Sequence, residues 1–277
     1  MSKVPSIILN NGVTMPQLGF GVWQVPDDEA AGAVGAALEA GYRSVDTAAV
    51  YENERGTGQA ITASGIGREE LFVTTKLWNS DQGYDSTLRA FDASLVRLGL
   101  DYVDLYLIHW PVPRLDAYID TYKAFEKILA DGRARAIGVS NFLPEHLERL
   151  VDATSVVPAV NQIELHPQLA QADSRAFHAR HDIATEAWSP LGQGKGLLEV
   201  PAVVAVARKH GRTPAQAVLR WHLQLGNVVI PKSVTPSRIR ENIEVFDFEL
   251  DAEDMAAFAA LDEGRRIGPD PTVFGSR

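Results

Sequence analysis

Strand-like and helix-like segments alternate along almost the whole chain. Eight short runs rich in Val, Ile, Leu and Thr are typical of buried strands, near residues 17–20, 42–46, 71–76, 103–109, 134–139, 158–162, 183–188 and 227–231. Helix candidates lie near 28–40, 52–64, 85–98, 116–130, 144–153, 171–180 and 213–225, with others near 200–210, 236–244 and 252–261. This alternation predicts an α/β protein, in which helices cover a parallel sheet.

The start of the chain departs from this alternation. Residues 6–9 and 13–16 are joined by Asn10-Asn11-Gly12, and Asn-Gly supplies the positive φ of a tight hairpin turn. A length of 277 residues fits one barrel domain as well as two small domains. Because no linker or low-complexity segment divides the chain, we expect a single domain over residues 1–277.

Composition excludes several classes of protein. The net charge of −10 and the absence of a basic run argue against a nucleic-acid partner. With no cysteine, the chain has no disulfide or thiolate chemistry. The first residues lack the apolar core of a signal peptide, and no apolar stretch reaches the ~20 residues that span a bilayer. We therefore expect a cytoplasmic protein with no membrane partner.

Three polar residues stand at the ends of predicted strands. Asp46, Lys76 and His109 each close an apolar run, and Tyr51 follows the first run by five positions. Because parallel strands end at one edge of the sheet, these side chains should emerge together, at the edge where α/β barrels keep their chemistry.

These four residues suggest proton donation. A tyrosine hydroxyl has a pKa near ~10, and the ammonium of Lys76 would lower the pKa of Tyr51. Asp46 would keep Lys76 charged, while His109 could donate a hydrogen bond to a substrate oxygen. The set suits a carbonyl oxygen that develops negative charge. It does not show what attacks the carbon.

Side chains after the later strands suit a nicotinamide cofactor. Amide-recognising groups and a flat stacking surface are provided by Ser140, Asn141, Gln162 and Trp188. After the eighth strand, cations and a hydroxyl gather at a helix start, which predicts an anion site. Its members are Lys232, Ser233, Arg238, Glu241 and Asn242.

Four ordered motifs resemble those of the aldo-keto reductase family. They are Gly41-Tyr-Arg-Ser-Val-Asp46-Thr-Ala-Ala-Val-Tyr51 with Glu54 and Gly58, Ile137-Gly-Val-Ser140-Asn141-Phe142, Asn161-Gln162-Ile-Glu-Leu-His-Pro167, and Ile230-Pro-Lys232-Ser233 with Arg238 and Asn242. The resemblance covers the whole chain. It implies a (β/α)₈ TIM barrel with an N-terminal β-hairpin and extra helices, which binds NADPH without a Rossmann motif and reduces aldehydes and ketones.

The resemblance also implies a role for individual residues. Tyr51 is the general acid, Lys76 and Asp46 tune it, and His109 orients the carbonyl. The 2′-phosphate of NADPH is assigned to Lys232, Ser233 and Arg238. The implied cofactor-binding residues are Ser140, Asn141, Gln162, Trp188, Ser189, Leu191, Gln193, Lys232, Ser233, Val234, Arg238, Glu241 and Asn242.

Within the family, the chain is most similar to bacterial 2,5-diketo-D-gluconate reductases. Leu191-Gly-Gln-Gly-Lys195 and Val245-Phe-Asp-Phe-Glu-Leu250 carry this likeness, and so does Trp188 in place of a commoner tyrosine. It implies a diketo-sugar acid or an α-dicarbonyl as substrate. The tail from Leu261 to Arg277 is short, and in the family the tail helps to close the substrate pocket, so the resemblance leaves the substrate specificity open.

Several of these residues could have a structural role instead of a functional one. Asp46 and Lys76 could form a purely structural ion pair. Trp23, Trp78 and Trp110 directly follow strands, where a substrate-pocket wall is more expected than a core position. No His-x-His or His-Glu-x-x-His metal signature occurs, so we expect no metal.

Two other classes of protein compete with a reductase. A barrel hydrolase would need a metal cluster or a nucleophile with its base. A cofactor-sensing subunit would keep NADPH without turning over a carbonyl substrate, so multiple turnover distinguishes it. We expect a small-molecule carbonyl as the partner and a monomer as the assembly.

Overall fold

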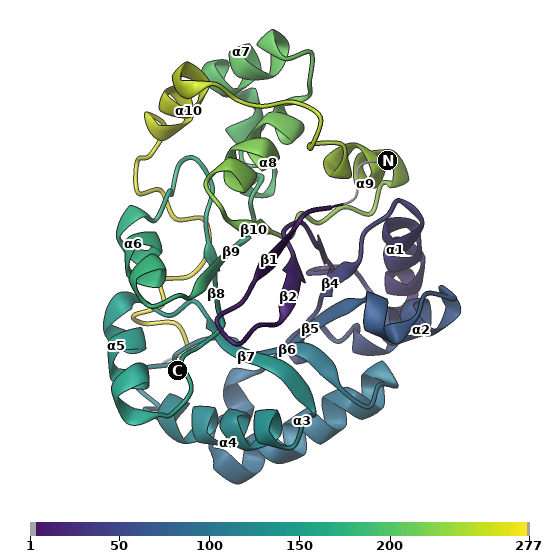
Figure 1. The fold of residues 1–277 in the computed structure, drawn as a ribbon, viewed down its shortest axis with the longest axis vertical. Helices are drawn as coiled ribbons and strands as arrows, with labels where there is room; N and C mark the ends of the chain where they lie inside the picture. Colours follow the sequence, from purple (N-terminus) through teal and green to yellow (C-terminus); the bar gives the residue numbers. More distant parts are fainter. Residues whose placement is uncertain (1–3, 276–277) are drawn as a thin grey trace.

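The computed structural model describes residues 4–275, and its centre is a barrel of eight parallel strands. In sheet order the strands are β3 (Phe20–Gly21), β4 (Ser44–Asp46), β5 (Phe72–Leu77), β6 (Val103–Ile108), β7 (Ala134–Ser140), β8 (Val160–Glu164), β9 (Ala184–Trp188) and β10 (Val228–Val229). Leu18 pairs with Val229, and the amide of Gly19 donates to the Val229 carbonyl at 2.8 Å, which closes the sheet. The predicted barrel is confirmed (Figure 1).

Helices surround the barrel, and every predicted helix is present within two residues of its expected bounds. They are α1 (Asp27–Glu39), α2 (Glu54–Ala63), α3 (Tyr84–Leu98), α4 (Tyr118–Ala130), α5 (Pro144–Ala153), α6 (Ala172–Arg180), α7 (Pro201–Lys209), α8 (Pro214–Gln224), α9 (Pro236–Ile243) and α10 (Ala252–Ala259). Short 3₁₀ turns are η1 (Ala49–Tyr51), η2 (Arg68–Glu70), η3 (Asn79–Asp81), η4 (Gly192–Gly194) and η5 (Leu197–Glu199). Within residues 4–275, no helix is long and apolar enough to cross a membrane.

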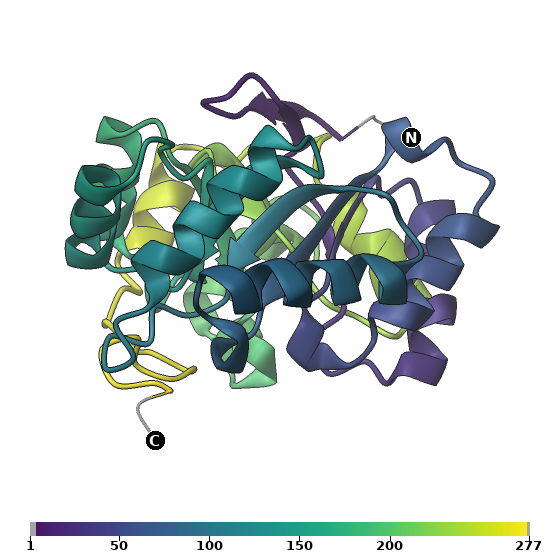
Figure 2. The same ribbon diagram turned by 90° about the horizontal axis from the view of Figure 1, so that it is seen from below.

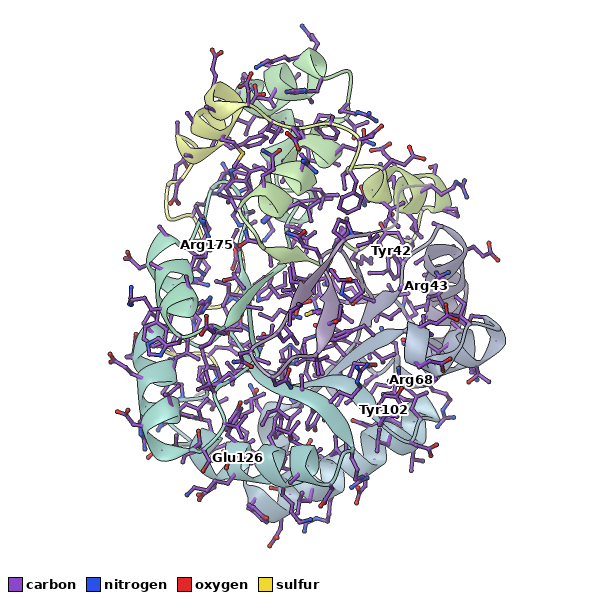
Figure 3. All side chains as sticks on the ribbon, viewed as in Figure 1. Tyr42, Arg43, Arg68, Tyr102, Glu126 and Arg175 are labelled. Carbon is purple, nitrogen blue, oxygen red and sulfur yellow. The ribbon has the colours of Figure 1, made fainter. Side chains whose placement is uncertain are left out.

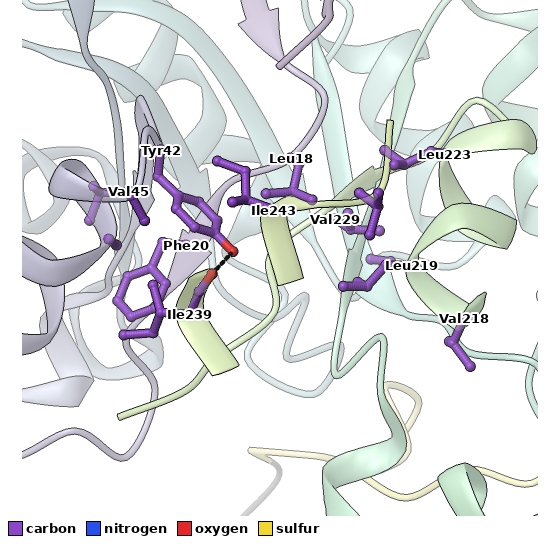
Figure 4. Close-up of a cluster of buried hydrophobic side chains, with 14 of the residues drawn as sticks. Leu18, Phe20, Tyr42, Val45, Val218, Leu219, Leu223, Val229, Ile239 and Ile243 are labelled. Atoms are coloured by element: carbon purple, nitrogen blue, oxygen red, sulfur yellow. Dashed lines mark hydrogen bonds between the residues drawn. The ribbon is translucent and has the colours of Figure 1, made fainter. Parts of the chain in front are cut away.

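Helix α8 shows how local sequence signals fix an element. Thr213 caps it by accepting from the Gln216 amide at 3.3 Å, and Pro214 occupies the first turn, where its missing N–H costs nothing. One face of α8, with Leu219 and Leu223, packs toward the closing strands around Val229 (Figure 4). The cap and the buried face together place the helix after β9.

The N-terminal hairpin covers one end of the barrel. Strand β1 (Ser6–Ile8) pairs antiparallel with β2 (Thr14–Pro16), and Met15 is fully buried. Asn10 Nδ2 donates to the Pro158 carbonyl at 3.1 Å, just before β8 begins. Figure 2 shows the hairpin at one end of the molecule and the C-terminal segment at the other. The hairpin therefore covers the amino ends of the strands and leaves the carboxyl ends for a site.

Near the amino ends of the strands, polar groups satisfy one another. The buried carboxylate of Asp104 contacts Arg68 at 2.7 Å and Arg135 at 2.8 Å, and it accepts from the Val73 amide at 2.9 Å. The Arg68 guanidinium lies 4.1 Å from the ring centroid of Tyr102 (Figure 3). This cluster ties β5, β6 and β7 together and is structural.

Candidate active site

Asp46, Tyr51, Lys76 and His109 meet at the carboxyl ends of neighbouring strands. Asp46 ends β4, Lys76 is the penultimate residue of β5, His109 follows β6 and Tyr51 ends η1. Lys76 Nζ lies 2.6 Å from Asp46 Oδ1 and 3.5 Å from the Tyr51 hydroxyl. It also donates to the Thr47 carbonyl at 2.9 Å. The structure thus brings together the four residues that the sequence singled out.

His109 stands opposite Tyr51. Their ring centroids lie 5.6 Å apart at an interplanar angle of 75°. Burial, with a smaller effect from Lys76, holds the pKa of His109 well below its usual value. The imidazole is therefore neutral at pH 7 and carries one N–H. It can donate that hydrogen to an oxygen placed between the two rings.

The pKa of Tyr51 differs from the expectation. Lys76 does lower this pKa, but burial raises it by more, and the net value lies above that of a free tyrosine. Burial also lowers the pKa of Lys76, yet Asp46 and Tyr51 outweigh this effect and raise it. Tyr51 is consequently a protonated phenol beside a charged ammonium. That state suits a proton donor better than a base.

A chain of amide and hydroxyl groups runs beside these residues. Asn141 Nδ2 donates to the His109 carbonyl and to Ser140 Oγ, both at 3.0 Å. Ser140 Oγ donates to the Gln162 carbonyl at 2.7 Å. Gln162 lies two residues before the end of β8 rather than at its end, and its Nε2 donates to Asp46 Oδ2 at 2.8 Å. Of the predicted amide-binding residues, Asn141 and Gln162 therefore contact the tetrad directly, and Ser140 bonds to both of them.

Trp188 is fixed at both ends of its indole. Its Nε1 donates to Asn141 Oδ1 at 2.8 Å. A Cβ added at Gly268 would lie 2.4 Å from Trp188 Cη2, so the tail backbone approaches the far ring at a distance that only glycine permits. The amides of Ile267 and Gly268 donate to the buried Glu164 carboxylate at 2.5 and 2.9 Å. The tail thus holds the plane of the indole.

The predicted anion site lies after β10, at the start of α9. Lys232 and Arg238 are exposed there, and Ser233 Oγ accepts from the Thr235 amide at 3.1 Å. Glu241 turns toward α8, where it accepts from Thr213 Oγ1 at 2.7 Å. The remaining members of the predicted cofactor site differ in exposure: Asn242 is buried, Val234 and Gln193 are exposed, and Ser189 and Leu191 are half-buried.

Comparison with known proteins identifies the family. A model of the Aldo/keto reductase family matches residues 15–263. The chain belongs to this family. It is 60% identical over 270 residues to an aldo-keto reductase from Mycolicibacterium smegmatis, which covers 98% of both chains. It is 52% identical over 273 residues to methylglyoxal reductase DkgA of Escherichia coli, again covering 98% of both.

Solved structures of similar proteins support the same family. Gox0644, as a mutant in complex with NADPH, superimposes with a TM-score of 0.94 at 51% identity, covering 98% of both chains. An aldo/keto reductase from Brucella melitensis gives a TM-score of 0.91 at 58% identity, covering 94% of this chain and 100% of the other. The predicted family and the predicted class, an oxidoreductase, are confirmed.

Aromatic side chains cluster beside the tetrad. Trp78 stands edge-on to His109 with ring centroids 5.2 Å apart, and Trp110 packs on Phe274 of the tail at 4.4 Å. Trp23 is 41% exposed and follows Val22, whose amide donates to the Asp46 carbonyl at 3.1 Å. That Trp23, Trp78 and Trp110 form a substrate-pocket wall stays a prediction. No periodicity in the sequence indicated that Phe274 would pack on Trp78 and Trp110.

One charged residue of the reductase interior was missed. Glu186 is fully buried in β9, and Gln162 Nε2 donates to its Oε2 at 2.9 Å. A signal was present, because Glu186 interrupts the run Ile183-Ala-Thr-Glu-Ala-Trp188 and shares the alternation of Trp188.

Proposed function

We propose that this reductase uses NADPH to reduce a small α-dicarbonyl of the methylglyoxal type, with Tyr51 as proton donor. The observation that carries the proposal is the meeting of the Tyr51 hydroxyl, charged Lys76 and neutral His109 at one strand edge. The amide groups of Asn141 and Gln162 adjoin this edge.

The chain's own groups fit a nicotinamide dinucleotide. Both hydrogen bonds of the Gln162 amide use its nitrogen, which leaves the amide oxygen to accept from a carboxamide. Trp188 provides a fixed stacking surface, and Lys232 and Arg238 present cations at a helix start. When bound, NADPH supplies the hydride that reduces the carbonyl carbon.

The proton for the new alcohol comes from Tyr51. As the substrate oxygen gains negative charge, the proton moves to it from the Tyr51 hydroxyl, and Lys76 at 3.5 Å stabilises the phenolate that remains. The N–H of His109 orients the same oxygen. Asp46 keeps Lys76 charged and in place at 2.6 Å. After turnover, Tyr51 regains its proton from solvent.

The substrate class is supported by an aromatic cluster beside His109 and by a relative. Trp78, Trp110 and Phe274 form an apolar wall close to His109, which suits a small carbonyl compound. The relative from Escherichia coli bears the name methylglyoxal reductase. A diketo-sugar acid remains the second candidate from the sequence motifs.

Turnover with a panel of carbonyls tests this function. We expect multiple turnovers of NADPH oxidation, with kcat/KM higher for methylglyoxal than for 2,5-diketo-D-gluconate or an aromatic aldehyde. A higher kcat/KM for the sugar acid would move the substrate to the second candidate. Tight NADPH binding with no turnover of any carbonyl would instead favour a cofactor-sensing subunit.

The anion site is tested by Arg238→Ala. One hydrogen bond to a charged group contributes about 1.5–3 kcal/mol, so the Kd for NADPH should rise roughly 10- to 100-fold. The Kd for NADH should change little, because NADH lacks the 2′-phosphate. Arg240→Ala removes another exposed cation of α9 and serves as the control. Fluorescence titration measures both constants, and equal losses for the two cofactors would contradict the assignment.

A further inference from the structure

Glu186 lies inside the barrel, next to the residues of the proposed chemistry but outside their assigned roles. It is fully buried on β9, and it shares a hydrogen-bond donor with Asp46. The Gln162 Nε2 atom lies 2.8 Å from Asp46 Oδ2 and 2.9 Å from Glu186 Oε2. Two carboxyl groups are thus neighbours across a single nitrogen atom.

The amide of Gln162 has no hydrogen left over. Its nitrogen carries two hydrogens, and Asp46 and Glu186 accept one each. The amide oxygen is consequently the end of the side chain that faces away from the carboxyl groups. Glu186 and Asp46 together therefore set which end of Gln162 is offered to a ligand.

The charges around Glu186 do not balance if it is ionised. On the flanking strands, β8 contributes Gln162, and β10 contributes the apolar Val228 and Val229. Across the barrel lie Asp46 and Lys76, with Tyr51 and neutral His109 beyond them. Among these described side chains, Lys76 alone is cationic, and Asp46 already pairs with it at 2.6 Å. A second anion would stand in this buried interior without a cationic partner of its own.

We propose that Glu186 is a positioning residue of this reductase: as a neutral carboxylic acid it orients the Gln162 amide and leaves Asp46 as the sole anionic partner of Lys76. The effect on rate rests on the proposed role of Tyr51. The charge state of Glu186 does not rest on it.

The proposal predicts that the rate of carbonyl reduction depends on pH. Burial, and then the charge of Asp46, raise the pKa of Glu186 to about 8. Above that pH, Glu186 releases its proton to solvent and becomes a second anion near Lys76, which raises the pKa of Tyr51. A phenol with a higher pKa is a weaker acid. The rate of carbonyl reduction should therefore fall as the pH rises through about 8.

Glu186→Gln tests the effect on rate. The variant keeps the shape of the side chain and cannot ionise, so kcat near pH 7 should stay within a few-fold of wild type, while the fall near pH 8 disappears. Glu54→Gln is the matched control, since Glu54 is a buried glutamate paired with Arg97 at 2.6 Å outside the site. Its pH profile should keep the fall. If Tyr51→Phe has lost its activity, a pH profile of Glu186→Gln that matches wild type would overturn the positioning role.

Protein stability gives a readout that does not depend on catalysis. The unfolded chain loses the Glu186 proton at the ordinary glutamate pKa of about 4.3, whereas the folded protein holds it up to about 8. The stability that the Glu186 proton contributes is complete below the pKa of the unfolded chain. It is lost as the pH rises to the pKa of the folded protein. Wild type should therefore lose stability relative to Glu186→Gln across this window. If the free energies of unfolding of wild type and Glu186→Gln changed in parallel across this pH window, Glu186 would be ionised throughout it and the proposal would be overturned.

The two readouts separate the proposal from the proposed function. If Tyr51 is not the proton donor, the stability difference persists while the pH profiles of wild type and Glu186→Gln coincide. If the variant does not fold, infrared spectroscopy of wild type labelled with isotopic glutamate gives the answer. A protonated-carboxyl band that vanishes near pH 8 supports the proposal. The absence of such a band at pH 7 overturns it.

Discussion

Replacing Tyr51 with phenylalanine should lower kcat for carbonyl reduction by ~10²–10⁴-fold, the contribution of a positioned general acid. Phenylalanine keeps the ring that stands edge-on to His109 and removes only the hydroxyl beside Lys76. The Kd for NADPH should change little, because no proposed cofactor contact involves this hydroxyl. Steady-state rates with methylglyoxal and fluorescence titration with NADPH give the two quantities.

Tyr84→Phe is the matched control for this loss of a hydroxyl. Tyr84 is 42% exposed at the start of α3, and its variant should keep the wild-type rate. Near-normal turnover by Tyr51→Phe would remove Tyr51 from the chemistry. An equal loss in NADPH affinity and rate would point instead to a binding role.

The fold and the tetrad were predictable because their signals are local. Apolar runs and helix caps depend on residues that are close together in the sequence. Parallel strands place their carboxyl ends at one edge of the sheet whatever the details of packing. Asp46, Lys76 and His109 therefore had to emerge together. Trp78 and Trp110 were placed at this edge by the same rule, since Trp78 directly follows β5 and Trp110 follows His109 after β6.

The contacts across the barrel were not predictable in this way. Gln162 meets Asp46 from the far side of the sheet, and the closure between Leu18 and Val229 fixes which inward side chains meet. Alternation along β9 shows that Glu186 faces inward, but it does not reveal the partner. The predicted direction of the Tyr51 pKa shift was wrong for a related reason, because the sequence shows the nearby cation and not the depth of burial.

The tail lies furthest from any sequence rule. Phe274 reaches Trp110, and Gly268 touches Trp188, although residues 260–275 contain no strand or helix. Such contacts depend on where an irregular segment docks, which no periodicity encodes. The tail therefore contacts both the aromatic side chains proposed as a substrate wall and the indole on which the nicotinamide is proposed to stack.

Lys76→Met should cost the protein both stability and activity. Lys76 and Asp46 are almost completely buried at 2.6 Å, and removing one partner leaves an uncompensated charge, which lowers the free energy of unfolding by about 3–5 kcal/mol. Lys123→Met is the control, because Lys123 and its partner Asp120 are both exposed and lie 3.3 Å apart. Its loss should cost about 1 kcal/mol or less. Urea unfolding measures both changes.

The double variant Lys76→Met with Asp46→Asn separates the structural role of the pair from its role in proton transfer. Neutralising Asp46 removes the stranded anion, so most of the lost stability should return. The rate should not return, because Tyr51 still lacks the cation that stabilises its phenolate. The pair would be purely structural if the double variant regained wild-type kcat together with stability. Recovery of stability at a low rate instead assigns Lys76 to the proton transfer and Asp46 to holding it there.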